Sequence, residues 1–280
     1  MTTDTHVPKL RIISLGWGVQ SFTLAAMAAV GEIPPVDYAI HADTTHEAAG
    51  TYAHAAKWTP WLEARGVKVL TVVANRPNVV LEDWSTSILI PAFTSDRAGN
   101  RGQTRRQCTY NWKIRPIRRR TRELLGGSLK PGSVQSIQGI SLDEWQRMRT
   151  SDVKYIVHDY PLVDLRMTRG DCVHWLQTHD LDIPPKSACT FCPYHNLSAW
   201  KALKRAGGPD WDKAVAVDEA IRHKREHGSG KPGGHEGQEG MLLFVHPACK
   251  SLPEAVDIPE DHGAEQLEFE IPCDSGMCFV

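Results

Sequence analysis

The sequence predicts an α/β protein built on a doubly wound, mostly parallel sheet, with a C-terminal helical region that carries cysteines. Over residues 10–73, short apolar runs alternate with longer helical segments in the order strand, helix, strand, helix, strand. The chain has 280 residues, of which 41% are hydrophobic and 23% charged. That is enough to bury a substantial core without disulfide bonds. We expect an α/β unit in residues 1–165 and a helical unit in residues 166–280.

Each expected element follows from its local sequence. Apolar runs predict strands at residues 10–14, 35–41, 67–73 and 133–139. Helical periodicity and capping residues predict helices at residues 21–30, 47–65, 81–90, 108–125, 168–178 and 198–227, the last broken at Gly207-Gly208-Pro209. Residues 92–107, polar and rich in glycine and arginine, predict a mobile loop, and residues 160–163 a short extended stretch.

The location of the protein is expected to be cytoplasmic. The polar N-terminus lacks the apolar core of a signal peptide, and no run of 18 apolar residues could span a membrane. In a reducing compartment, cysteines favour metal binding or catalysis over disulfides. The seven cysteines are Cys108, Cys172, Cys189, Cys192, Cys249, Cys273 and Cys278.

Charge is distributed very unevenly along a chain whose net charge is −1. Residues 97–122 hold ten Lys and Arg and no acidic residue, whereas no Lys or Arg follows Lys250. In many proteins such a basic block binds phosphate groups. Here we expect the phosphates to be bound by Arg105, Arg106, Lys113 and Arg115. The alternative is a solvated helix face.

A glycine-containing turn joins the first strand to the first helix, between Ser14 and Ser21. Backbone N–H groups at such a helix start suit a phosphate, although many α/β proteins use a similar turn only to reverse the chain. Asp43 ends the second strand, where an acidic residue can hold a ribose hydroxyl or simply cap the next helix. Because ligands of parallel sheets bind at the carboxyl ends of the strands, the turn and Asp43 are expected to meet.

Cys189 and Cys192 form a C-x-x-C that is followed by Pro193. The spacing leaves four outcomes open: zinc, an iron–sulfur cluster, a thioredoxin-like dithiol or a structural disulfide.

Four blocks of sequence together resemble a known family. They are Ser14-Leu-Gly-Trp-Gly-Val-Gln-Ser21, with Gln20 where the common loop has Asp; Asp43-Thr-Thr-His-Glu47 with Thr51-Tyr52, where Thr45 replaces a glycine; Arg106-Gln-Cys-Thr109 with Lys113-Ile-Arg-Pro116; and Ser187-Ala-Cys-Thr-Phe-Cys-Pro193. In this order they resemble the PAPS reductase-like branch of the adenine nucleotide alpha hydrolase (PP-loop) superfamily. The resemblance implies that superfamily's HUP-like fold, ATP or adenylyl-sulfate with Mg²⁺ as ligand, and sulfur chemistry. The nucleotide-binding residues it implies are Ser14, Gly16, Trp17, Gly18, Val19, Gln20, Ser21, Asp43, Thr44, Gly139, Arg106 and Lys113.

The resemblance also implies a [4Fe–4S] cluster bound by Cys108, Cys189 and Cys192. Cys172 is the preferred fourth ligand, because it lies 17 residues before Cys189 in a helix that a turn at Pro184-Pro185 could fold back. A three-cysteine cluster with one open iron is the alternative, and a zinc site remains open as well.

Three functions remain open at this stage. The leading one is ATP-dependent sulfur transfer, in which the substrate is adenylated and then thiolated with the help of the cluster. The second is reduction of adenylyl-sulfate, with Cys273 or Cys278 of the tail as the catalytic thiol, although that tail could also be a simple frayed end. The third is a non-enzymatic iron–sulfur sensor or nucleotide-binding module. The expected partners are a sulfur donor or thiol reductant and a nucleic-acid or small-molecule acceptor, with a homodimer left open.

Overall fold

A computed structural model of the chain describes residues 8–74, 90–127, 129–226 and 238–257. Its larger sheet has five parallel strands in the order β3-β2-β1-β6-β7. The strands are β1 (Leu10–Ser14), β2 (Tyr38–Asp43), β3 (Lys68–Val73), β6 (Val134–Ile137) and β7 (Ile156–Asp159). The predicted parallel α/β architecture is therefore confirmed, and the strand order reverses between β1 and β6.

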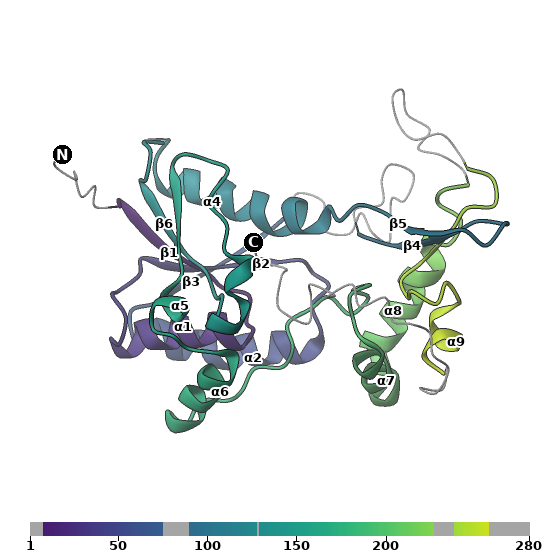
Figure 1. Ribbon diagram of the computed structural model, residues 1–280. Coiled ribbons are helices and arrows are strands. Elements are labelled where there is room, and N and C mark those ends of the chain that lie inside the picture. Colours follow the sequence, from purple (N-terminus) through teal and green to yellow (C-terminus); the bar gives the residue numbers. More distant parts are fainter. Residues whose placement is uncertain (1–7, 75–89, 128, 227–237, 258–280) are drawn as a thin grey trace.

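Helices cover both faces of this sheet, as Figure 1 shows. They are α1 (Val19–Val30), α2 (Ala49–Glu63), α4 (Arg115–Leu124), α5 (Pro161–Asp164) and α6 (Arg169–Thr178). Successive residues of β1 serve opposite faces, because side chains alternate along a strand. Ile13 packs in the cluster with α1 and α6, whereas Ile12 packs in the cluster that includes Ile117 of α4. The parallel sheet and these helices form the first lobe.

A second lobe carries a small antiparallel sheet in the order β5-β4-β8. The strands of this sheet are β4 (Phe93–Ser95), β5 (Arg101–Gln103) and β8 (Leu242–Phe244). The helices of the lobe are α7 (Leu197–Ala206), α8 (Gly208–Ile221) and α9 (Leu252–Val256). Its core includes Trp112, Phe191 and Trp200. Figure 1 shows it beside the first lobe, beyond the end of α4.

The expected loop at residues 92–107 is wrong, because β4 and β5 form a hairpin there. Asp96 closes the turn by accepting hydrogen bonds from the backbone N–H groups of Ala98 (2.9 Å) and Asn100 (2.8 Å). The other edge of β4 pairs with β8, which lies far along the chain. A partner so distant leaves no local signal, so the polar composition of the segment was misleading.

Other differences are smaller. The stretch at residues 160–163 was expected to be extended, but it begins the single-turn helix α5, with Pro161 at a position that proline favours. The boundary expected near residue 165 does not separate the lobes, since α6 packs on α1 while β4 and β5 join the second lobe. The helix expected at residues 81–90 lies almost entirely outside the described residues. None of the described helices is long and apolar enough to cross a membrane.

Candidate functional site

The turn after β1 lies where the strand order reverses, between β1 and β6. Gly18 is the N-cap residue of α1, with extended backbone angles and no side-chain cap, and no acidic residue occupies the first turn. The first N–H groups of a helix have no partner within the helix and carry its positive dipole end. In open α/β sheets, ligands bind at this switch point. The turn therefore has the backbone geometry that suits a phosphate, and phosphate binding there stays a prediction.

Internal contacts hold this turn in shape. The backbone N–H of Gly16 donates to Ser21 Oγ (3.1 Å), and Ser21 Oγ lies 3.3 Å from the carbonyl oxygen of Gly18. Trp17 has a left-handed φ of 56° and a side chain that is 1% exposed, packed edge-on against His41 and His54. Of the predicted phosphate-binding residues, Trp17 can therefore contribute only backbone.

The end of β6 closes the other side of the turn. A Cβ atom on Gly139 would lie 2.8 Å from the backbone nitrogen of Ser21, so only glycine allows this approach. The Gln20 amide donates to Glu144 Oε2 (3.2 Å), which also accepts from Arg147 (2.6 Å). Burial raises the pKa of Glu144, and the Arg147 charge opposes that rise. The structure thus places Gly139 and the partner of Gln20 on the same side of the turn.

Asp43 at the end of β2 lies beside the turn. Its Oδ1 accepts from the backbone N–H of Thr45 (2.7 Å) and from the Tyr52 hydroxyl (2.8 Å). Burial and this bond to Asp43 raise the pKa of Tyr52, so its hydroxyl stays protonated as a donor. Within the described part of the chain, no hydrogen bond uses Asp43 Oδ2. Asp43 Oδ2 can therefore accept a hydrogen bond from a ligand, and the ribose contact stays a prediction.

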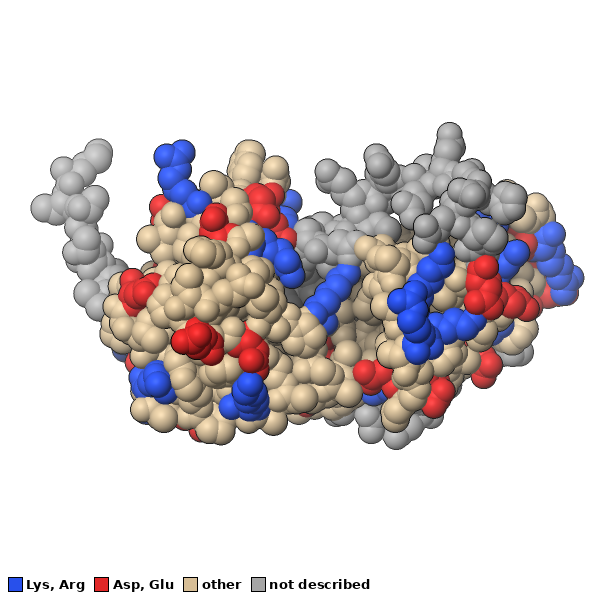
Figure 2. All heavy atoms as spheres, turned by 90° about the horizontal axis from the view of Figure 1, so that it is seen from below, with Lys and Arg blue, Asp and Glu red and all other residues tan. Residues whose placement is uncertain are grey.

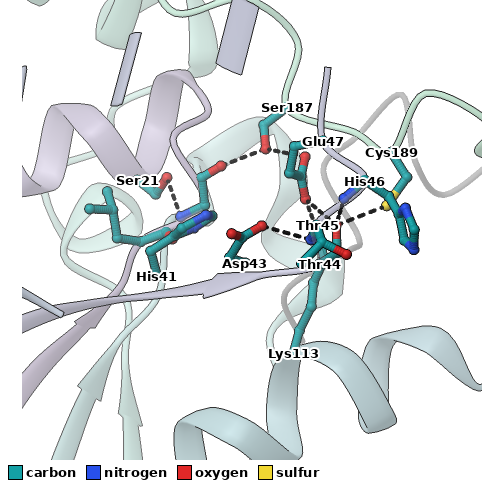
Figure 3. Close-up of polar contacts among 12 residues, drawn as sticks. Ser21, His41, Asp43, Thr44, Thr45, His46, Glu47, Lys113, Ser187 and Cys189 are labelled. Carbon is teal, nitrogen blue, oxygen red and sulfur yellow. Dashed lines mark hydrogen bonds and ion pairs between the residues drawn. The ribbon is translucent and has the colours of Figure 1, made fainter. Parts of the chain in front are cut away.

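A buried ion pair lies next to Asp43. Glu47 Oε1 is 3.4 Å from Lys113 Nζ, and the two side chains are 1% and 7% exposed. The Thr44 hydroxyl lies 3.4 Å from Glu47 Oε1 and 3.4 Å from Cys189 Sγ (Figure 3). Thr44 and Lys113, both predicted to bind nucleotide, are therefore engaged with Glu47. Burial raises the pKa of Cys189, with Glu47 adding to the rise and Lys113 opposing it, so this group is a neutral thiol at pH 7.

The C-x-x-C segment is joined directly to the phosphate turn. The Ser187 hydroxyl donates to the carbonyl oxygen of Gly16 (2.5 Å) and lies 3.4 Å from Glu47 Oε2. The backbone of Glu47 pairs with that of Cys189 in an antiparallel bridge. Figure 3 shows Ser187 beside Glu47, with a dashed line between their side chains. A thiol and a phosphate seat are thus held by one connected set of hydrogen bonds.

Cys172 does not join Cys108 and Cys189, two of the other cysteines expected to bind a cluster. Cys108 and Cys189 pack against the core of the second lobe, whereas Cys172 lies in the core of the first lobe and is 0% exposed. Burial raises the pKa of Cys172 to about 12. Over the described ranges, no group of three or more His, Cys, Asp or Glu side chains could hold a metal ion. This arrangement does not fit a four-cysteine cluster, and Cys273 and Cys278 lie outside the described residues.

Most of the basic block has structural partners. Arg118 pairs with Asp152 and Arg120 with Glu123, Arg119 and Arg122 donate to Val73 O and Tyr155 Oη, and Arg97 pairs with Glu239. Arg106, predicted to bind phosphate, lies over the Tyr194 ring at 5.4 Å. These arginines therefore already have polar or aromatic partners within the protein, and phosphate binding by the basic block stays a prediction. Figure 2 shows Lys and Arg beside the hollow between the lobes.

Sequence reasoning missed two residues of α8. Lys213 Nζ donates to the carbonyl oxygen of Thr45 (2.8 Å), and Asp210 Oδ2 accepts from the backbone N–H of Ala49 (2.9 Å). One signal pointed to Asp210: Ala48, which precedes α2, is a poor N-cap residue, so the cap had to come from elsewhere. Ser187 and Glu47 lay inside recognised blocks but had no assigned role.

Comparison with known proteins finds similarity among solved structures. No family model and no curated protein matches the chain. Among solved structures, the chain is similar to a phosphoadenylyl-sulfate (PAPS) reductase from Candida auris in its phosphate complex, with a TM-score of 0.42 and 13% identity over 65% of this chain and 78% of that one. The α/β fold of the chain is established by the strand order of its larger sheet.

Proposed function

We propose that this protein is an enzyme of sulfur chemistry that binds an adenine nucleotide, and that its reaction is ATP-dependent sulfur transfer. The observation that carries the proposal is the Ser187 hydroxyl, which donates to the phosphate turn at Gly16 and lies 3.4 Å from Glu47 Oε2. Glu47 in turn pairs with Cys189. A nucleotide seat and a thiol held in one network suit a reaction between a nucleotide-activated atom and sulfur.

The nucleotide half of the site consists of three parts. The turn before α1 and the first helical N–H groups face the phosphates, and Asp43 Oδ2 accepts a ribose hydroxyl. Gly139 closes the turn on the β6 side without a side chain. The absence of acidic residues from the first turn of α1 keeps like charge away from bound phosphate.

The sulfur half of the site is Cys189 with its neighbours Thr44, Glu47 and Lys113. In the proposed reaction, an oxygen of the acceptor attacks the α-phosphorus of ATP and pyrophosphate leaves. The terminal sulfur of a persulfide on Cys189, supplied by a sulfur donor, then attacks the activated carbon, and AMP leaves with the oxygen. A thiol reductant breaks the remaining S–S bond, which leaves the sulfur on the acceptor and a mixed disulfide on Cys189. No step of this scheme passes through a metal cluster.

Product analysis tests the proposal. The full chain is incubated with ATP, a persulfide donor, a thiol reductant and either bulk RNA or a pool of small metabolites, and pyrophosphate and AMP are measured. We expect Cys189→Ser to abolish thiolation but not the release of pyrophosphate, which precedes the sulfur step. Cys249→Ala, which changes a half-buried thiol that donates to Thr94 O, should retain both.

A parallel incubation with adenylyl-sulfate and a thiol reductant measures sulfite. Sulfite release without pyrophosphate chemistry would replace sulfur transfer by sulfonucleotide reduction, whose expected thiols are Cys273 and Cys278. If neither substrate binds or reacts, the proposed function is wrong.

A further inference from the structure

Two side chains of the second lobe bind one short segment of the first. We call residues 43–49, between β2 and α2, the site segment. Asp210 Oδ2 accepts from Ala49 N (2.9 Å), and Lys213 Nζ donates to Thr45 O (2.8 Å). Both come from the first turns of α8. The site segment carries Asp43 at one end and the partner of Cys189 in its middle, so contacts to it reach both halves of the site.

Asp210 replaces a cap that α2 lacks. The N-cap residue of α2 is Ala48, which has no side chain able to accept a hydrogen bond, and no acidic residue lies in the first turn. A carboxylate at a helix N-terminus satisfies an N–H group and favours the positive end of the helix dipole. Asp210 supplies both from the other lobe, and so stabilises the start of α2, where the site segment ends.

Lys213 stabilises an unfavourable turn. Thr45 has a left-handed φ of 62°, which β-branched residues rarely adopt. Its backbone is held from both sides, because its N–H donates to Asp43 Oδ1 (2.7 Å) and its carbonyl oxygen accepts from Lys213. The orientation of the Asp43 carboxylate is therefore linked to Lys213 through a single residue.

The same segment is bound to the thiol. Ala48 N donates to Ala188 O (3.3 Å), and Thr190 N donates to His46 O (2.9 Å), which places Cys189 opposite Glu47. We propose that Asp210 and Lys213 are positioning residues, which hold the site segment so that Asp43 and Cys189 act on one bound nucleotide. This inference rests on the proposed function for its nucleotide, but the clamp itself is a property of the free protein.

The experiment uses the full chain with Asp210→Ala, Lys213→Met and the double variant. Asp210→Asn and Lys213→Arg retain the acceptor and the cation, and Asp212→Ala removes the adjacent exposed carboxylate of α8 as a matched control. Three quantities are measured: amide hydrogen exchange over residues 43–49, the rate of iodoacetamide alkylation at Cys189 by mass spectrometry, and ATP affinity.

We expect Asp210→Ala and Lys213→Met each to speed exchange of the site segment and alkylation of Cys189 by roughly fivefold, the factor that corresponds to one lost cap. ATP affinity should fall by a similar factor, and Asp210→Asn, Lys213→Arg and Asp212→Ala should behave as wild type. If the substitutions only destabilised the fold as a whole, amide exchange would change throughout the chain. Asp210→Asn and Lys213→Arg would then not restore wild-type exchange.

The outcomes separate the two proposals. Wild-type exchange and alkylation in the double variant would overturn the clamp. A loosened segment with unchanged ATP affinity would overturn the positioning role. If the wild-type protein binds no adenine nucleotide, the proposed function fails, and exchange and alkylation alone decide whether Asp210 and Lys213 hold the site segment.

Discussion

Gly139→Ala should damage the phosphate turn without touching any ligand. The added Cβ would lie 2.8 Å from Ser21 N, 3.0 Å from its Cα and 3.1 Å from its Cβ. Two of these atoms are backbone, so no flexible side chain can move aside. Either β6 or the first turn of α1 has to shift, and the Ser21 hydroxyl that receives the Gly16 N–H moves with it.

The magnitude follows from the contacts. Overpacking by one methyl group costs about 1–3 kcal/mol, and the bond between Gly16 and Ser21 contributes about 1 kcal/mol. We therefore expect the free energy of unfolding to fall by about 2–4 kcal/mol. A displaced N–H group also loses its charge-assisted bond to phosphate, worth about 1.5–3 kcal/mol, which weakens ATP binding by about 10- to 100-fold.

Urea unfolding and calorimetric titration with ATP measure the two effects. The control is Gly170→Ala in the first turn of α6, whose Cβ would meet only Thr168 Oγ1 at an ordinary 3.6 Å. It should bind ATP normally and be unchanged or slightly more stable, since alanine reduces the entropy of the unfolded chain. Wild-type stability and ATP affinity in Gly139→Ala would refute the close approach of β6 to the turn.

Three further predictions follow from the site and its surroundings. Gly18→Val should fold normally, since Gly18 has backbone angles that any residue adopts and an added Cβ would meet only Ser187 at 3.9 Å. The variant should nevertheless lose ATP binding, because the valine side chain enters the phosphate seat. Equal ATP affinity in the variant and the wild type would contradict this prediction. Burial lowers the pKa of His54 to about 4, so the unfolded chain gains a proton first as the pH falls below about 6.5, and stability should drop by about 2 kcal/mol between about pH 7.5 and pH 5 from this group. In urea unfolding, His54→Phe should show a smaller drop, and an unchanged pH dependence would refute the assignment. Anaerobic iron, sulfide and zinc analysis tests the predicted cluster: about four iron atoms per chain that are lost in Cys108→Ala, Cys189→Ala and Cys192→Ala would establish it, and metal-free protein would remove it.

The first lobe was predictable because its signals are local. The apolar run of β1 and the alanine-rich α1 were placed within two residues of their observed starts. The second lobe was not predictable from local sequence, because its sheet joins residues 93–103 to β8. These segments become strands only by pairing with one another. Short strands whose stability comes from distant partners leave little trace in composition.

The site divides in the same way. The meeting of the turn after β1 with Asp43 was predicted because the carboxyl ends of neighbouring parallel strands lie together. Gly139 was expected only from the family resemblance. The partners of the arginines could not be predicted, because a run of positive charge does not identify the groups that it binds. Arg118 lies close to the nucleotide-binding block in sequence, but Asp152 binds it.

The buried pair of Glu47 and Lys113 is best understood through geometry rather than stability. Removing two charges from water costs several kcal/mol for each ion, so such a pair contributes little to folding compared with apolar side chains of the same volume. Its effect here is orientation. With Oε1 held by Lys113 and Thr44, Oε2 faces the Ser187 hydroxyl that binds Gly16. Glu47 thereby connects the thiol to the phosphate turn with both carboxylate oxygens, which an apolar residue of equal size could not do.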